Sequence, residues 1–148
     1  MKFNTKTRYG IRTMLEIAIQ RHQGGIFQKE IATNQHISYK YLDQIISALK
    51  TAELIANVKG KKSGYKLTRD ADDISIYDIH NAFEPGICLV ECLSDTSKCK
   101  VEDTCATKKL YSGLNLKIIE YLKAYTLQDL VNEQIKLDKT LSKEETRD

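Results

Sequence analysis

The chain has 148 residues, of which 41% are apolar, and this is enough to build a single hydrophobic core with a projecting element. It contains no run of 18 apolar residues, which excludes a membrane-spanning helix. The first ten residues lack the apolar stretch of a secretory signal, so we expect a cytoplasmic protein without a membrane partner. Residues 1–69 hold 13 Lys or Arg against 4 Asp or Glu, whereas residues 70–148 hold 10 against 16. The basic first half favours a polyanionic partner such as nucleic acid.

The first half predicts a helix-turn-helix. Apolar residues recur at helical spacing in residues 8–20, and Gly24 and Gly25 end that helix. A short helix follows at about residues 28–33, and then comes the turn NQHIS. Ser38 stands where it would cap a further helix that begins at Tyr39 and buries one apolar face. The residues expected on that face are Tyr41, Leu42, Ile45, Ile46 and Leu49.

The segment LIANVKGKKSGYKL, residues 54–67, predicts two short strands with a reversal at Gly60 and Gly64. A helix-turn-helix that is followed directly by a basic hairpin is a winged helix. We therefore predict a mainly α-helical protein with a small β-hairpin wing.

A winged helix places its second helix in the major groove of DNA and its hairpin beside it, near the phosphates. Asp43 repels phosphate, so it is either a base reader that accepts a hydrogen bond from cytosine N4 or an ordinary solvated residue. The alternative for the whole unit is a helix-turn-helix used only for packing, with solvated lysines. The predicted DNA-binding residues are Ser38, Tyr39, Lys40, Asp43 and Gln44 on the helix, and Lys59, Lys61 and Lys62 on the wing.

The second half predicts three more helices. The first is ended by Pro85 and Gly86. The next is long and carries an apolar stripe, which we expect to be covered by the same helix of a second chain, as in a homodimer, or by its own domain. Thr126 and Asp129 predict the cap of a short last helix. The stripe consists of Leu110, Leu114, Ile118, Tyr121 and Tyr125.

The expected organisation follows from these elements. The units are a DNA-binding domain at 1–84, a cysteine-rich loop at 85–106, a dimerisation helix with a short last helix at 107–135, and a mobile charged tail at 136–148.

All four cysteines, Cys88, Cys92, Cys99 and Cys105, lie within 18 residues of a polar loop. In a reducing compartment such a cluster favours metal binding over disulfides, and thiol-based redox sensing stays open. Thiolates suit an iron–sulfur cluster. Zinc is the competing metal, although only Cys88 and Cys92 have the spacing typical of zinc loops.

Four segments of the chain resemble the bacterial IscR/NsrR/RirA regulators, a family of winged-helix iron–sulfur transcription factors. The segments are TKTRYGIRTMLEIA, IATNQHISYKYLDQIISALKTAELI, VKGKKSGYKL and the cysteine loop. The resemblance implies a dimeric winged-helix repressor that binds a double-stranded DNA operator. It also implies a 2Fe–2S or 4Fe–4S cluster that tunes operator affinity in response to iron status, redox state or nitric oxide.

In that family three loop cysteines hold the cluster, and the matching residues here are Cys92, Cys99 and Cys105. Some relatives add a histidine where this chain has Lys108, and others add a carboxylate where it has Arg8, so the fourth ligand is open. Cys88 is the local candidate, and an acidic residue of the loop, Glu91 or Asp103, or a small molecule are alternatives.

Two alternative functions remain open for the whole chain. One is a winged-helix regulator with a structural zinc or a thiol switch, and the other is a small iron–sulfur carrier protein. An enzyme is not expected, because the three histidines are scattered and none is paired with a nucleophile.

Overall fold

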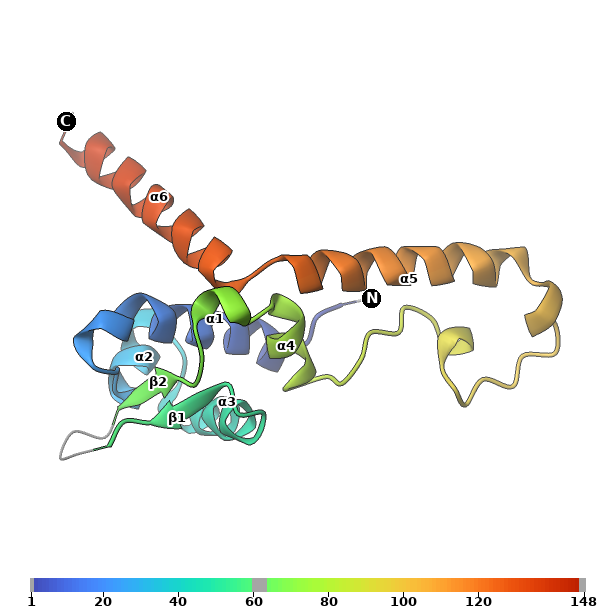
Figure 1. Cartoon of the computed structure of the whole chain (residues 1–148), viewed down its shortest axis with the longest axis horizontal. Coiled ribbons are helices and arrows are strands. Elements are labelled where there is room, and N and C mark those ends of the chain that lie inside the picture. Colours follow the sequence, from blue (N-terminus) through green and yellow to red (C-terminus); the bar gives the residue numbers. More distant parts are fainter. Residues whose placement is uncertain (1, 60–63, 147–148) are drawn as a thin grey trace.

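The computed structural model describes residues 2–59 and 64–146 and is mainly helical, with one two-stranded hairpin (Figure 1). The predicted fold class is confirmed. Short 3-10 turns lie between several of the main elements. In chain order the elements are α1 (Thr5–Ile19), η1 (Gln20–Gln23), α2 (Gln28–Gln35), α3 (Tyr39–Thr51), β1 (Ile55–Asn57), β2 (Tyr65–Leu67), η2 (Ala71–Asp73), α4 (Ile76–Asn81), η3 (Glu91–Leu93), η4 (Glu102–Thr104), α5 (Ala106–Ala124) and α6 (Leu127–Glu145).

The core is built where α1, α2, α3, α4 and the start of α6 meet. From α1 it takes Met14 and Ile17, which are at most 1% exposed. Helix α3 contributes the apolar face that its periodicity predicts. Every residue of that face is buried except Tyr41, which is partly buried. Apolar burial of this extent is the main term that stabilises a domain of this size.

The helix-turn-helix forms through local capping. His36 ends α2 in the left-handed region with φ of 53°, and the Ser38 side chain then accepts a hydrogen bond from the N–H of Tyr41 at 3.2 Å. An N-cap of this kind satisfies one of the free N–H groups at a helix start and contributes about 1 kcal/mol. The predicted cap is confirmed, and it fixes where α3 begins.

The hairpin pairs Ile55 with Leu67 and Asn57 with Tyr65 in antiparallel register. Tyr65 also exchanges two backbone hydrogen bonds with Ile26, at 3.1 and 2.8 Å, which attaches the hairpin to the chain ahead of α2. Gly64 suits this close approach, because a Cβ there would lie 3.1 Å from the backbone of Ile26, which would have to shift slightly. The predicted reversal at Gly60 lies outside the described residues.

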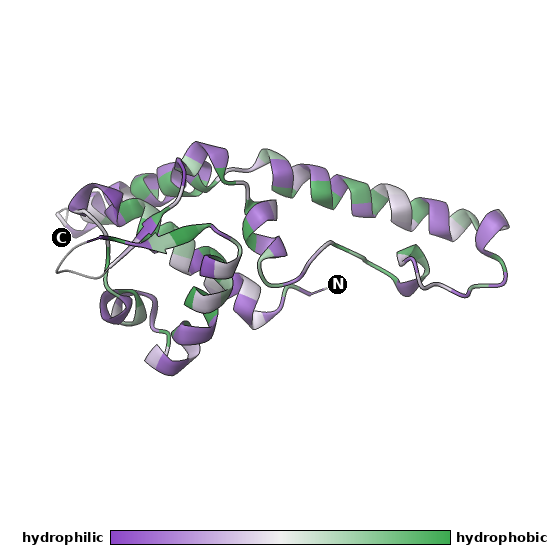
Figure 2. Ribbon diagram, turned by 60° about the horizontal axis from the view of Figure 1, so that its bottom comes forward, coloured by the Kyte–Doolittle hydropathy of each residue, from purple (hydrophilic) through white to green (hydrophobic). Residues whose placement is uncertain are grey.

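The chain between α4 and α5 runs away from the core, and α5 returns alongside it (Figure 1). Apolar and polar residues alternate along this helix (Figure 2). Within the described part of the chain α5 has no buried residue, although it contacts α4 and η3. The long helix that the sequence predicts is therefore present, and its apolar stripe is largely open.

Helix α6 is longer than the sequence analysis expected. Thr126 and Asp129 form the predicted capping box, but the helix continues to Glu145, through most of the segment expected to be a mobile tail. The reason is compositional: after Gln134 the segment contains no Gly or Pro and is rich in Lys, Leu and Glu, which are good helix formers.

None of the helices that the structure describes is both long enough and apolar enough to cross a membrane.

Candidate DNA-reading surface and cysteine loop

The predicted reading residues gather on the outward face of α3. Tyr39 is 55% exposed, and Ser38, Lys40, Asp43 and Gln44 are also exposed, while the opposite face of the helix is in the core. The exposed side chains include hydroxyl, ammonium, carboxylate and amide groups, which are the types that contact phosphates and base edges. On the wing Lys59 is exposed, whereas Lys61 and Lys62 lie outside the described residues.

A polar clamp holds the turn between α2 and α3. Glu16 of α1 is 7% exposed, and its two carboxylate oxygens accept hydrogen bonds from the Asn34 amide at 2.7 Å and the Gln35 amide at 2.8 Å. Arg12, one turn earlier on α1, donates to the Gln35 side chain at 3.0 Å and also to its backbone carbonyl. A buried carboxylate is tolerated only when it is hydrogen-bonded in this way. The clamp therefore fixes the end of α2 against α1.

A second network joins α2, α3 and the wing, and the sequence analysis missed it. Gln28 is 9% exposed, and its amide nitrogen donates to the Asp43 carboxylate and to the backbone carbonyl of Tyr39. Its amide oxygen accepts from the Tyr65 hydroxyl at 3.2 Å. Burial, assisted by the neighbouring Tyr39 and Asp43, raises the pKa of Tyr65, so this hydroxyl remains a donor.

The cysteine loop lies at the far end of α5 from the core (Figure 1). Cys88 and Cys99 are exposed, Cys92 and Cys105 are half-buried, and the four are free thiols. Among residues 2–59 and 64–146, no three His, Cys, Asp or Glu side chains converge in a way that would hold a metal ion. The structure thus places the predicted ligands in one loop but does not bring them together.

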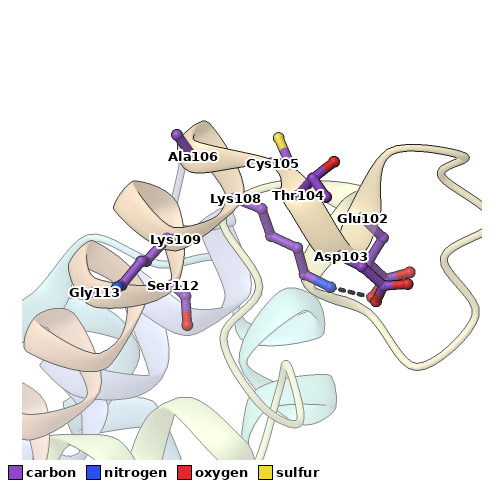
Figure 3. A pocket seen from close by; sticks show the side chains of 9 residues that line it. All are labelled: Glu102, Asp103, Thr104, Cys105, Ala106, Lys108, Lys109, Ser112 and Gly113. Atoms are coloured by element: carbon purple, nitrogen blue, oxygen red, sulfur yellow. Dashed lines mark hydrogen bonds and ion pairs between the residues drawn. The ribbon is translucent and has the colours of Figure 1, made fainter.

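Cys105 is the N-cap residue of α5 and borders an open hollow of about 750 Å³ (Figure 3). Its sulfur lies 3.1 Å from the Thr107 hydroxyl. Hydrogen bonds from that hydroxyl and from the Lys108 backbone, with the Lys108 charge, lower the pKa of the Cys105 thiol. Lys108 pairs with Glu102, which raises the pKa of the ammonium and keeps it charged. A charged Lys108 cannot be a metal ligand.

Cys88 is held elsewhere on α5. The Asn115 side chain donates to the carbonyl of Ile87 at 2.8 Å and accepts from the N–H of Leu89 at 3.0 Å. Asn115 lies ten residues after Cys105, which is about 15 Å along a helix. Cys88 could therefore join the other three cysteines only after this clamp opens.

Comparison with known proteins matches residues 3–133 to the Rrf2 family, described as an iron-dependent transcriptional regulator. The chain is 34% identical over 138 residues to the HTH-type transcriptional regulator IscR of Sodalis glossinidius, covering 93% of this chain and 83% of that protein. Among solved structures it is similar to CymR (YrzC), the global cysteine regulator of B. subtilis, with a TM-score of 0.76, 32% identity and coverage of 90% and 98%. It is also similar to T. potens IscR, with a TM-score of 0.73, 30% identity and coverage of 90% and 88%. These relatives are transcriptional regulators rather than enzymes, and the resemblance noted in the sequence is confirmed.

Proposed function

Because the chain belongs to the Rrf2 family of transcriptional regulators, we propose that it is a dimeric, sequence-specific DNA-binding regulator whose operator affinity is set by sulfur chemistry in its cysteine loop. The main support for DNA binding is the exposed polar face of α3, which lies beside the wing in the basic half of the chain. In this proposal Ser38, Tyr39, Lys40, Asp43 and Gln44 read the operator, and Lys59, Lys61 and Lys62 contact its backbone.

The apolar stripe of α5 supports a homodimer. Leu110 and Tyr121 are each 66% exposed and Leu114 is 50% exposed, all on the same side of a 19-residue helix. A continuous apolar stripe of this length on a helix that leaves its own core is stabilised when another helix covers it. The same helix of a second chain is the proposed cover, and it would place two reading surfaces on one operator.

Cys92, Cys99 and Cys105 are the residues that would hold an iron–sulfur cluster. The donor set fits, because all three are free thiols in one polar loop and a lowered pKa makes the Cys105 thiolate readily available. The loop must change shape to bring them together. When bound, the cluster would supply a group that is lost or altered by iron shortage, oxidant or nitric oxide. The chain itself would couple the cluster to DNA binding through the loop, which joins α4, in the proposed DNA-binding domain at 1–84, to the start of α5.

Oxygen-free purification tests this proposal, with iron and zinc content, absorbance and Mössbauer spectra measured on the same sample. We expect iron and a visible absorbance that is lost in Cys92→Ala, Cys99→Ala and Cys105→Ala, and an operator affinity that differs between the two states by about 5–150-fold. Iron-free protein would contradict the cluster, and zinc in its place would indicate a structural zinc site. Failure to select any operator from random duplexes would contradict the DNA-binding role.

The environment of Cys105 favours a second candidate, a thiol switch without metal. Its thiol has a lowered pKa and borders an open hollow, and these are the features of a cysteine that oxidants attack. We expect Cys105 to be alkylated fastest of the four cysteines at pH 7, with Thr107→Val slowing it and the nearby exposed Thr104→Val leaving it unchanged. Peptide mass spectrometry of briefly treated, iron-free protein measures this. Equal rates for all four cysteines would exclude the thiol switch at Cys105.

A further inference from the structure

The polar atoms of the Gln28 side chain, on α2, form hydrogen bonds with two other elements, helix α3 and the wing strand β2. The carboxylate of Asp43 and the carbonyl of Tyr39 can only accept hydrogen bonds, so the amide nitrogen must face them. The amide oxygen then faces Tyr65 on the wing strand. The orientation of this amide is therefore dictated by its partners, because reversing it would set the amide oxygen against the Asp43 carboxylate and the Tyr39 carbonyl, which cannot donate.

Gln28 itself is not placed to read DNA. Its side chain is buried beneath the exposed Tyr39 and Asp43, between two surface hollows of about 400 and 380 Å³ that both also border Tyr65. Asp43 is exposed, and Gln28 engages only its Oδ1 atom. Within the described residues the second oxygen of Asp43 accepts no hydrogen bond, and the bond of the first oxygen to Gln28 limits the directions in which the carboxylate can point.

We propose that Gln28 is a positioning residue for operator recognition: it orients the Asp43 carboxylate relative to the wing strand, so that base preference at the operator position facing Asp43 depends on a residue that does not touch DNA. This inference rests on the proposed DNA-binding function. A carboxylate held by a neighbouring amide presents one oxygen in a fixed direction, whereas a freely rotating carboxylate does not discriminate among bases as well.

The test uses the full chain and a double-mutant cycle. Operators are first selected from random duplexes with the parent protein, and base preference at each position is then measured for Asp43→Ala, Gln28→Leu and the double variant. Leu approximates the volume of Gln but neither donates nor accepts hydrogen bonds. We expect both single variants to lose about tenfold discrimination at the same base pair, the size of one good side-chain contact to a base. The double variant should lose no more than Asp43→Ala alone, because Gln28 acts through Asp43.

Non-specific affinity and its salt dependence should not change in Gln28→Leu, since no phosphate contact is removed. Thr51→Ala is the matched control, because Thr51 borders the second hollow and its hydroxyl donates to the Ser47 carbonyl rather than to the network, and it should keep the parent preference. If Gln28→Leu does not fold, Tyr65→Phe removes only the wing-side hydroxyl. It should lower the same preference by about threefold, as expected for one hydrogen bond.

Several outcomes would overturn the inference. They are an unchanged preference in Gln28→Leu or in Tyr65→Phe, a uniform loss of affinity on every sequence, additive losses in the double variant, or no effect of Asp43→Ala. Each of these leaves operator binding by the parent intact. If the parent selects no operator at all, the proposed function fails instead, so the two failures are distinguishable.

Discussion

Asn115 brackets Cys88: its one amide group binds the carbonyl of the residue before that cysteine and the N–H of the residue after it. The Asn115 side-chain amide thus takes the place of a backbone peptide group in a β-bridge. It attaches the entry of the cysteine loop to the middle of α5. Cys88 itself donates to the carbonyl of Val90 at 3.0 Å. The loop beyond Cys88 thus begins from a fixed point on α5.

Asn115→Leu should release this fixed point. Two hydrogen bonds of about 1 kcal/mol each are lost, so the local opening equilibrium should rise by roughly tenfold or more. We expect a corresponding increase in the hydrogen-exchange rate of the Leu89 amide, whose N–H donates to Asn115, and little change at the Cys99 amide; peptide mass spectrometry measures both. Asn132→Leu on α6 is the control, because Asn132 only accepts from Gln128 on the same exposed helix face. Equal Leu89 exchange rates in the parent and Asn115→Leu would show that Asn115 does not hold the entry of the cysteine loop.

Leu114→Asp should separate the proposed dimer. A carboxylate in the middle of the apolar stripe would be buried without a partner, which costs several kcal/mol, so the dissociation constant of the dimer should rise by at least about a hundredfold. Sedimentation across a range of concentrations measures the change. Ser112→Asp places the same group about halfway around the helix and should stay associated. A parent protein that is monomeric at all concentrations would rule out this use of α5.

Glu16→Ala should destabilise the helix-turn-helix by about 2–3 kcal/mol, because two partly buried hydrogen bonds from the Asn34 and Gln35 amides to a charged acceptor are lost. Urea unfolding followed by circular dichroism measures the free energy. Glu133→Ala removes a carboxylate of the same size from the exposed face of α6 and should change stability by less than about 0.5 kcal/mol. If both variants unfold at the same urea concentration, the clamp on the helix-turn-helix contributes nothing.

The sequence predicted the elements whose signals are local. The apolar period of α3, the cap at Ser38 and the capping box at Thr126 all lie within a few residues of the structure they determine. The hydrogen-bond networks around Gln28 and Asn115 could not be predicted in this way, because their partners are far apart in the sequence. Gln28 and Tyr65 are 37 residues apart, and Asn115 and Leu89 are 26 apart. A polar residue at such a position has no periodicity that distinguishes it from a solvated one. The length of α6 was underestimated for another reason: its charged second half suggests a mobile tail, but it contains no helix breaker after Gln134, and the helix continues to Glu145.

His80 should make folding stability depend on pH. Its side chain is 4% exposed, packs edge-on against Phe3 and, within the described residues, leaves Nδ1 without a hydrogen-bond partner. Burial lowers the pKa of His80 below its ordinary value of 6.5, although Glu84, whose carboxylate lies 3.7 Å from Nε2, opposes this. The unfolded chain therefore binds this proton more readily than the folded chain.

Stability should accordingly be full above about pH 6.5 and fall as the pH drops through the window between 6.5 and the lower folded pKa. The measurement is the difference in Tm between pH 7.5 and pH 5.5, which should be larger in the parent than in His80→Leu. His22→Gln, on the exposed turn η1, should keep the parent's pH dependence. Parallel profiles for the parent and His80→Leu would show instead that other groups, such as the carboxylates, account for the acid sensitivity.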